Sequence, residues 1–338
     1  MKKIKWAIIG AGKIVDKRAI PGLLEDSNNE IVSIMDTSID AAKSLSEKYS
    51  IPAYFDDEDK MLSSVECDAV YVATPIFCHY KQAMIVLKHN CHLFIEKPLA
   101  MTGEESEAIV DAFRKAKKQI NVGYMMQHHN LHKKAKSIIK RGGIGQLVSA
   151  RLQFSCWYPH IPGAWRQVKS LGGGGCIMDL AVHCMDLFSS ITGESIKDVK
   201  AFYSTHTFDY EVEDSAAIIF KSDKGVLGYI DVNFNVADNA TASKVEFYGT
   251  EGSLVAEGTI GQEEKGKLKY TYAPQEAYDA MHGQNFIKPK ISYGKGGNLY
   301  TKQFSEFSKL ILAEKTNYKN AKRAVEIQKI CDRIYSEN

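Results

Sequence analysis

The sequence IKWAIIGAGKI, at residues 4–14, joins a short apolar run to a glycine turn and the start of a helical pattern. A buried parallel strand reads as a continuous apolar run of this kind, because both of its faces are covered. At Gly10-Ala11-Gly12 the backbone must turn sharply, and small residues let a ligand approach it closely. The stretch therefore predicts the first strand, turn and helix of a parallel α/β sheet.

The same alternation of short apolar runs and helical patterns continues through the first third of the chain. Right-handed crossovers between such strands produce a doubly wound sheet with helices on both faces. We expect a Rossmann-like, dinucleotide-binding domain over residues 1–123. Its expected strands cover residues 4–10, 31–36, 68–73, 92–96 and 120–123, and its first helices cover residues 13–24 and 39–49.

The pattern changes after residue 124, where strands joined by turns predict a mainly antiparallel sheet with one covered face. We expect a second α/β domain over residues 124–338. Residues 258–298 are rich in Gly, Lys and Gln and have no clear periodicity; a substrate loop and a subunit contact are both open interpretations. The expected strands are 147–158, 199–207, 215–220, 225–234 and 244–248, and the expected helices are 130–141, 176–192, 300–312 and 320–335.

Composition narrows the class of protein. The chain has 338 residues, 44% of them hydrophobic, and a net charge of +2, so nothing favours a nucleic-acid or membrane partner. The apolar run at residues 6–11 is too short for a signal peptide and leads into the glycine turn. Seven scattered cysteines, odd in number and without a Cys-x-x-Cys pair, are typical of reduced thiols in a cytoplasmic protein.

The glycine turn is a candidate phosphate site. Gly10 and Gly12 would shape the turn, and Lys13 and Ile14 would open the helix whose free N–H groups face a pyrophosphate. The third glycine of the usual dinucleotide pattern is Val15 here, so a plain glycine turn remains the alternative.

Asp36 ends the second expected strand, where a carboxylate accepts hydrogen bonds from ribose hydroxyls. A carboxylate there also repels a 2′-phosphate, and no Lys or Arg follows before Lys43. This pattern favours NAD over NADP. The alternative is an acidic cap for the next helix.

Two further loops follow buried strands. In Glu96-Lys97-Pro98 the lysine would point into the ligand crevice beyond the strand ends, and the proline permits a cis bond; a surface lysine in a turn is the alternative. His79, after Thr74-Pro75, would lie near the cofactor or merely begin a helix.

A run of four glycines at residues 172–175 precedes Asp179 and His183, which are four residues apart and so share one face of a helix. An imidazole titrates near neutral pH and suits proton transfer during oxidation of an alcohol. A hydrogen-bonded core pair is the alternative. The nearby histidines 128, 129 and 132 are adjacent residues that rarely converge on one ion, so we expect no metal site.

Taken together, these motifs resemble the glucose–fructose oxidoreductase/inositol dehydrogenase (Gfo/Idh/MocA) family, and the resemblance covers nearly the whole chain. It implies a Rossmann domain followed by an α/β domain whose open sheet often mediates oligomerisation. The matching motifs are Gly10-Ala11-Gly12, Thr74-Pro75, Glu96-Lys97-Pro98, Trp165-Arg166, the stretch from Gly173 through Asp179 to His183, and residues 248–253 (YGTEGS).

The resemblance also implies a catalytic set, carried here by Lys97, Asp179 and His183. Family members often carry an arginine in the segment that matches residues 124–132, where this chain has Gln127, so a phosphorylated or acidic sugar is disfavoured. The expected substrate-binding residues are Lys97, Tyr124, Gln127, Trp165, Arg166, Asp179 and His183. Tyr158 could also line the sugar site, and core packing is the alternative for Tyr158 and Trp165.

These observations predict an NAD(P)-dependent oxidoreductase that moves a hydride to or from the carbinol carbon of a sugar or polyol. We expect a homodimer or homotetramer. Two other functions stay open: a glycosidase that uses bound NAD for transient oxidation, and a regulator that binds the cofactor without catalysis. Retention of Lys97, Asp179 and His183 argues against the regulator.

Overall fold

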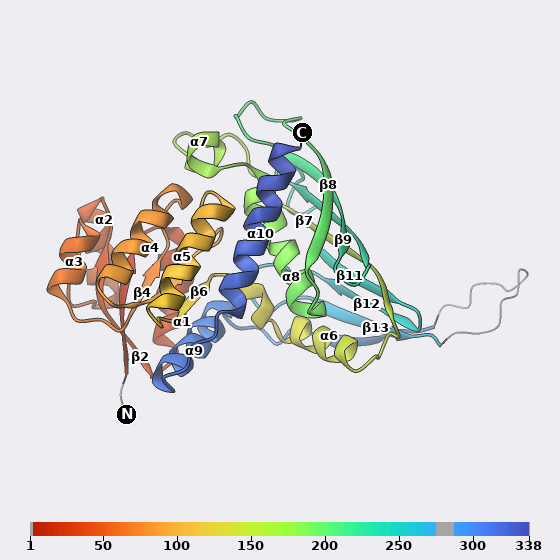
Figure 1. Cartoon of the computed structure of the whole chain (residues 1–338), viewed down its shortest axis with the longest axis horizontal. Helices are drawn as coiled ribbons and strands as arrows, with labels where there is room; N and C mark the ends of the chain where they lie inside the picture. The colour runs from red at the N-terminus through yellow and green to blue at the C-terminus, as the bar shows by residue number, and fades with distance from the viewer. Residues whose placement is uncertain (1–2, 242, 275–286, 338) are drawn as a thin grey trace, which may run out of the picture. The chain divides into compact units, whose positions relative to one another are not determined.

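A computed structural model describes residues 3–241, 243–274 and 287–337, and the chain divides into two units (Figure 1). The first unit comprises Met1–Met125, Val168–Gly173 and Asn298–Asp332. The second comprises Met126–Gln167, Gly174–Gly297 and Arg333–Asn338. The first unit thus includes the first C-terminal helix and most of the second, whereas a domain boundary after residue 123 stays a prediction.

The first unit contains a six-stranded parallel sheet in the order β3-β2-β1-β4-β5-β6. This order reverses between β1 and β4, and ligands of such sheets bind beyond the carboxyl ends of the strands at that reversal. The doubly wound sheet predicted from the apolar runs is confirmed. Its strands are β1 (Ile4–Ile9), β2 (Asn29–Met35), β3 (Tyr54–Phe55), β4 (Ala69–Val72), β5 (His92–Ile95) and β6 (Ile120–Val122).

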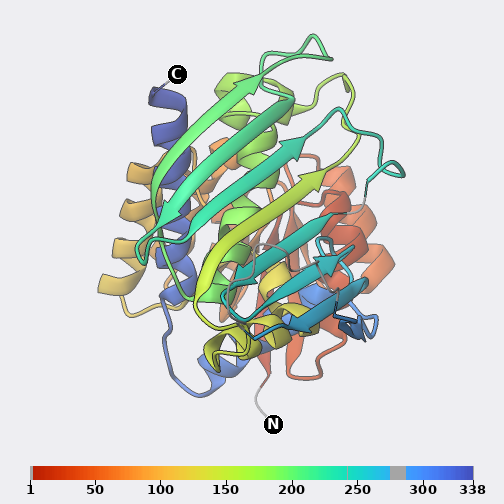
Figure 2. The same ribbon diagram turned by 90° about the vertical axis from the view of Figure 1, so that its right-hand side faces the viewer.

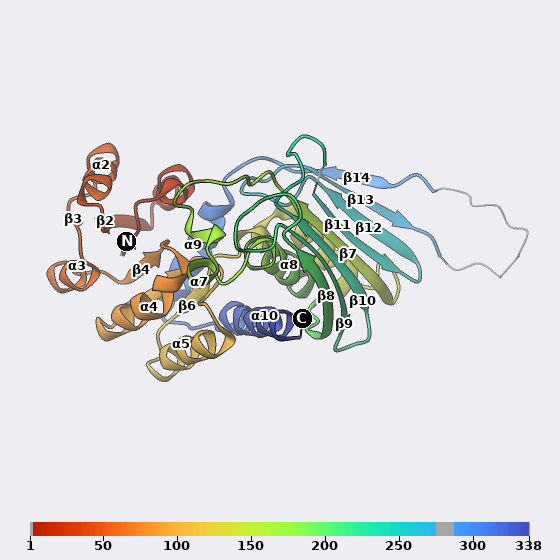
Figure 3. The same cartoon turned by 90° about the horizontal axis from the view of Figure 1, so that it is seen from above.

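Helices flank this sheet; in Figure 3, α4 and α5 lie on one side and α9 on the other. Local capping explains where two of them begin, because Ser38 accepts the Ala41 N–H before α2 and Thr102 accepts the Glu105 N–H before α5. The helices are η1 (Val15–Ala19, a π turn), α1 (Ile20–Leu24), α2 (Ile39–Tyr49), α3 (Glu58–Ser64), η2 (Ile76–Cys78), α4 (His79–Lys88), α5 (Gly103–Lys115), α7 (Lys169–Gly172), α9 (Leu299–Leu312) and α10 (Lys319–Ser336).

Aromatic packing holds the C-terminal helix α9 in the first unit. Trp6 of β1 lies with its ring centroid 5.5 Å from those of both Phe304 and Phe307 on α9. Phe94 of β5 lies 4.9 Å from Phe304, and all four side chains are buried. Such rings bury large apolar areas, so the N-terminal sheet and a helix from the end of the sequence share one core.

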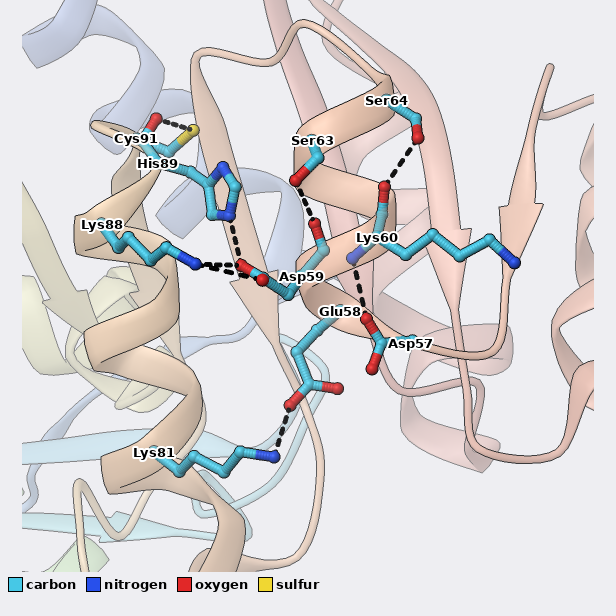
Figure 4. A network of polar contacts seen from close by, with 10 residues as sticks. All are labelled: Asp57, Glu58, Asp59, Lys60, Ser63, Ser64, Lys81, Lys88, His89 and Cys91. Atoms are coloured by element: carbon cyan, nitrogen blue, oxygen red, sulfur yellow. Dashed lines mark hydrogen bonds and ion pairs between the residues drawn. The ribbon is translucent and has the colours of Figure 1, made fainter.

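A surface network joins α3 to α4 (Figure 4). Lys88 Nζ donates to Asp59 at 3.0 Å, and His89 Nε2 lies 2.6 Å from the same carboxylate. The contact with His89, followed by that with Lys88, holds the pKa of Asp59 below its usual range. These contacts hold α3 against α4 and involve none of the residues of the glycine turn.

The second unit contains an eight-stranded sheet in the order β14-β13-β12-β11-β7-β10-β9-β8. Only the β7–β10 pair among the described pairings is parallel, so the predicted mainly antiparallel sheet is confirmed. Its strands are β7 (Leu147–Ser155), β8 (Ile196–Ser204), β9 (Ser215–Ser222), β10 (Leu227–Asn233), β11 (Lys244–Gly249), β12 (Gly252–Glu257), β13 (Lys267–Tyr272) and β14 (Lys290–Tyr293).

One face of this sheet is covered, and Figure 2 shows α8 behind the strands. Burial alternates along β9, where Ile218 and Phe220 point to the core and Ile219 is exposed. The helical turn that precedes α8 packs against β7 and β10. The helices of the second unit are η3 (Met125–His128), α6 (Asn130–Lys140), η4 (Trp165–Gln167), η5 (Ile177–Ala181, a second π turn) and α8 (Val182–Thr192).

Several strands escaped the sequence analysis. Periodicity predicted neither β12 nor β3, and the unplaced segment 258–298 supplies β13 and β14. β13 carries Lys267, Lys269 and Tyr270 on a half-buried surface, and its pairing with β12 rather than its composition makes it a strand. Residues 275–286 of that segment lie outside the described residues.

The helical stretch Lys169–Thr192 meets the length and hydropathy criteria for a membrane span, which no other helix among the described residues does. Yet 83% of its apolar window is buried within the structure. A helix that is apolar all round and buried is typical of a protein core.

Candidate active site

The two glycines of the first turn have different surroundings. Gly10 has φ of +105°, and a Cβ there would lie 2.7 Å from the carbonyl oxygen of Ala73 at the end of β4. Only glycine satisfies both demands. A Cβ on Gly12 would meet no atom within 4 Å, so this side of the turn is open. That open space fits a pyrophosphate passing close to the backbone.

The helix beyond the turn begins at Lys13 and Ile14, as predicted. Val15, in the place of the third glycine, is fully buried and starts the π turn η1. π turns are frequently found at functional sites, and this one lies where the first helix faces the expected phosphates. An incomplete glycine pattern is therefore compatible with the expected turn.

Asp36 follows β2 and ties its end to the glycine turn. One carboxylate oxygen accepts the Ala11 N–H at 2.7 Å, and the other accepts the Ser38 N–H at 2.9 Å. The cap of α2 is Ser38 rather than Asp36. Each carboxylate oxygen can accept a further hydrogen bond, so ribose hydroxyls fit this position.

The loops after β4 and β5 are joined by His79. Its Nε2 lies 3.0 Å from the Thr74 oxygen, and its Nδ1 lies 2.9 Å from the Pro98 oxygen. The side chain is buried, and the Thr74 hydroxyl donates to Gln82 at 2.5 Å. His79 does begin α4, as one of its two interpretations held, and it also fixes two loops on which predicted site residues stand.

Glu96 and Lys97 follow β5, and the bond between Lys97 and Pro98 is cis. The Tyr71 hydroxyl donates to Glu96 at 2.7 Å, and a Cβ on Gly123 would lie 2.8 Å from the same carboxylate. Burial, followed by the charge of Glu96, raises the pKa of Tyr71 well above its usual value. Glu96 is thereby held at the sheet edge, and Lys97 is half-buried beside it.

The predicted cofactor residues therefore share one edge of the parallel sheet. Gly10 and Gly12 follow β1, Asp36 follows β2, and the pairs Thr74-Pro75 and Glu96-Lys97 follow β4 and β5. The reversal of strand order falls between β1 and β4, so the expected dinucleotide crevice and the predicted residues coincide.

In the second unit, Asp179 lies on the π turn η5 and His183 in the first turn of α8. Arg166 Nε lies 3.6 Å from Asp179, and its guanidinium stacks over the ring of Trp165 at 4.2 Å. The structure thus brings the adjacent residues Trp165 and Arg166 together with Asp179, which the sequence places thirteen residues after Arg166. His183 is 5% exposed, and its ring contacts Phe154 of β7 with centroids 6.1 Å apart.

Tyr158 belongs to the same neighbourhood. Burial raises the pKa of its hydroxyl, and Arg166 and its hydrogen bond oppose that rise. Tyr158 also packs against Phe234 with centroids 4.9 Å apart, so the core-packing alternative holds for part of its ring. The arginine meets both a carboxylate and a phenol, an arrangement suited to a polyhydroxylated ligand.

The remaining predicted residues lie around β6 and α6. Tyr124 is buried just after β6 in the first unit, and Gln127 lies on η3 in the second. His129 and His132 bond to the segment that the sequence left unplaced, through the Lys265 oxygen at 2.9 Å and the Thr259 hydroxyl at 2.9 Å. Burial lowers the pKa of His132 to about 3, so this ring is neutral.

Sequence reasoning missed one group at this site. The carboxylate of Glu213 accepts the N–H groups of Gly175 and Ile177, at the start of the helix that carries Asp179 and His183. The glycine run was the available signal, because side chains at Gly174 and Gly175 would overlap Tyr335 and Glu213. A run of four glycines before a buried helix indicates that something approaches the backbone closely, but not what.

Lys97 belongs to the first unit, whereas Asp179 and His183 belong to the second. Each unit by itself presents the groups that the sequence predicted for it. The meeting of all three at one substrate is a proposal, taken up below.

Comparison with known proteins identifies the class. Residues 4–124 match the "Oxidoreductase family, NAD-binding Rossmann fold", and residues 132–255 match the "GFO/IDH/MocA C-terminal domain". The protein is thus an oxidoreductase with an NAD(P)-binding Rossmann domain, and it belongs to the Gfo/Idh/MocA family.

Individual relatives cover most of the chain. It is 27% identical to 1,5-anhydro-D-fructose reductase of Ensifer adhaerens over 85% of this chain and 86% of that protein. It is 27% identical to D-glucoside 3-dehydrogenase of Escherichia coli K12 over 82% and 84%. The crystal structure of aldose-aldose oxidoreductase from Caulobacter crescentus matches 99% of this chain and 97% of that chain, with a TM-score of 0.87 and 20% identity.

Proposed function

We propose that this oxidoreductase transfers a hydride between NAD and the carbinol carbon of a sugar or polyol. The observation that carries the proposal is the pairing of Arg166 with Asp179 at the start of the helix that also carries the buried His183, in a chain whose first unit has a Rossmann sheet. Relatives named as a reductase of an anhydrosugar and a dehydrogenase of glucosides support a sugar as substrate.

In this proposal the nicotinamide, when bound, accepts or returns the hydride. His183 takes the hydroxyl proton during oxidation and gives it back during reduction. Lys97, as an ammonium, stabilises negative charge that develops on the substrate oxygen. Asp179 orients the substrate hydroxyls and is itself oriented by Arg166 at 3.6 Å. Substrate hydroxyls would also bond to Tyr124, Gln127 and Trp165.

NAD rather than NADP is proposed as the cofactor. The Asp36 carboxylate stands beside the glycine turn, bonded to Ala11, where it suits ribose hydroxyls and disfavours a 2′-phosphate. Gly10, Gly12, Lys13 and Ile14 would surround the pyrophosphate, and residues of the β4 and β5 loops (Thr74, Pro75, His79, Glu96 and Lys97) would border the nicotinamide half.

The test is a substrate panel with purified protein: D-glucose, a methyl D-glucoside and myo-inositol with NAD or NADP, and 1,5-anhydro-D-fructose with the reduced cofactors. We expect net change in nicotinamide absorbance with at least one sugar. A glycosidase would cleave the methyl glucoside without accumulating reduced cofactor. Cofactor binding without any turnover would overturn the proposal in favour of a regulator.

For a substrate found in this way, Lys97→Ala and His183→Ala should each lower kcat by ~10²–10⁴-fold with cofactor affinity nearly unchanged. His206→Ala is the matched control, because His206 is an exposed histidine of the same unit. Turnover equal to the wild type in both site variants would refute the catalytic assignment.

We also propose a homodimer or homotetramer formed through the uncovered face of the eight-stranded sheet. Phe202 on β8 is 86% exposed, and Ile219 on β9 is 59% exposed, which supports burial against a second copy. Ile219→Asp should shift the mass measured by light scattering toward the monomer. Leu24→Asp, a similarly exposed leucine of the first unit, should not. The seven cysteines carry thiols rather than disulfides, which supports a cytoplasmic location.

A further inference from the structure

A single buried residue, Glu213, binds three successive N–H groups ahead of the helix that carries Asp179 and His183. Its Oε1 accepts from Gly175 at 2.9 Å and from Ile177 at 3.0 Å. Its backbone oxygen accepts from Cys176 at 3.0 Å. The amino end of the helix is thus held by one residue that lies more than thirty positions later in the chain.

These bonds replace a local cap. The first N–H groups of a helix have no partner within it, and a neighbouring Ser, Thr, Asp or Asn usually accepts one of them. Here the residue at the cap position is Cys176, whose side chain accepts no such bond. Glu213 therefore determines where this helix starts. Asp179 lies two residues after Ile177, so its position along and around the helix axis also depends on Glu213.

The glycine run makes this contact possible. A side chain on Gly175 would overlap the Glu213 backbone, and one on Gly174 would overlap the Tyr335 hydroxyl. That hydroxyl donates to the same Glu213 oxygen at 2.7 Å. The last two glycines of the run are therefore explained by Tyr335 and Glu213 without any role in phosphate binding.

Glu213 is itself fixed to the sheet by the next residue. The Asp214 carboxylate accepts the N–H groups of His206, Thr207 and Phe208 at 2.7–3.0 Å. The backbone oxygen of Asp214 accepts from Phe234, just after β10. The bonds of Asp214 thus hold Glu213 at the end of the sheet, and the bonds of Glu213 hold the start of the helix.

A buried carboxylate is a costly way to cap a helix. Glu213 is 6% exposed, and burial raises its pKa, although the bonds from Tyr335, Gly175 and Ile177 oppose this. The arrangement therefore suits a position where placement of the helix matters.

We propose that Glu213 is a positioning residue for hydride transfer: it sets where Asp179 and His183 stand and does not contact the substrate. This inference rests on the proposed function. Displacing a reacting group by about 1 Å can lower a rate by about 10²-fold, so the effect appears in kcat rather than in cofactor binding.

The variants are Glu213→Ala, which removes the acceptor, and Glu213→Gln, which keeps an oxygen able to accept the same bonds. Glu194→Ala is the matched control. Glu194 is also buried, follows the opposite end of the same helix, and accepts the Ser222 hydroxyl at 2.5 Å. Each variant is measured for kcat, KM, NAD affinity, melting temperature and amide exchange of peptides covering residues 174–183, using the panel sugar with the highest kcat/KM.

We expect Glu213→Ala to lower kcat by about 10–100-fold, with NAD affinity within about twofold and faster amide exchange over residues 174–183. Glu213→Gln should restore most of kcat. Glu194→Ala should keep kcat despite a comparable drop in melting temperature.

The inference is overturned if Glu213→Ala is as active as the wild type, or if Glu194→Ala loses as much kcat at the same melting temperature. If Glu213→Ala does not fold, Glu213→Gln and Tyr335→Phe decide instead: unchanged amide exchange over residues 174–183 together with unchanged kcat in both would also overturn it. A wild type that turns over no panel sugar indicates failure of the proposed function, which is a different result.

Discussion

The choice between NAD and NADP is predicted to depend on the charge of Asp36. Asp36→Asn is the informative substitution, because it keeps the shape of the side chain and one oxygen acceptor while removing the charge. The two carboxylate oxygens accept the N–H groups of Ala11 at 2.7 Å and Ser38 at 2.9 Å. Asparagine has a single acceptor oxygen, so the variant must lose a hydrogen bond from one of these N–H groups or from a ribose hydroxyl.

The magnitude follows from these bonds. Losing a hydrogen bond to a charged group costs about 1.5–3 kcal/mol, which is a rise of about 10- to 150-fold in the Kd for NAD. The Kd for NADP should fall instead, by about tenfold, because two unit charges about 4 Å apart repel by about 1 kcal/mol in bulk water and by up to about 4 kcal/mol near a protein surface. The two cofactors are therefore expected to respond in opposite directions.

Titration calorimetry of the wild type, Asp36→Asn and Asp40→Asn with each cofactor measures this. Asp40 is the matched control, an exposed carboxylate in the first turn of α2 that lies outside the glycine turn. Equal weakening of NAD and NADP by Asp36→Asn would refute the charge argument and leave Asp36 as a support of the turn alone.

Gly12→Ala should leave the melting temperature unchanged, because its Cβ meets open space, and should weaken NAD; unaltered NAD binding would contradict a phosphate site there. Gly10→Ala should lower the melting temperature as well, since φ is +105° and Ala73 is close, and thermal unfolding with and without NAD separates the two variants. Because the folded pKa of His132 is about 3 against about 6.5 in the unfolded chain, protons bind the unfolded chain preferentially, and the free energy of unfolding falls as pH drops through that window. His132→Gln should remove this part of the pH dependence. Urea titrations at several pH values measure the free energy of unfolding at each pH. If that free energy depends on pH as strongly in the variant as in the wild type, the His132 ring is not the cause.

Much of the first unit was predictable because its signals are local. The apolar run at residues 4–9 indicates a buried strand, and a glycine directly after it indicates a sharp turn with positive φ at Gly10. Both signals lie within a few adjacent residues. The helix over residues 39–49 was predicted with the bounds that the structure has, and Ser38 and the left-handed Ser50 explain both ends. The place of Asp36 directly after β2 was predictable for the same reason, since a strand end and its next residue are adjacent in the chain.

Non-local elements were the ones missed. β13 and β14 exist because β12 offers them an edge to pair with, and no alternation in their own residues announces this. The two π turns, Val15–Ala19 and Ile177–Ala181, occur in segments whose sequences predict ordinary helices. The hydrophobic periodicity of a sequence indicates which face of a helix is buried. It does not indicate whether one turn of that helix contains the extra residue of a π turn.

The sequence by itself determined the two sheet classes, the glycine turn with Asp36 after the next strand, and the helical stretch that carries Asp179 and His183. Only tertiary structure decided that α9 packs on Trp6, that Arg166 meets Asp179, and that Glu213 fills the space left by the glycine run. The physical reason is that backbone conformation and amphipathic faces are properties of a few adjacent residues. Which side chain packs against a given residue across the core depends on how distant segments fold back. A glycine in the sequence indicates that another group approaches the backbone there, but it does not indicate which group.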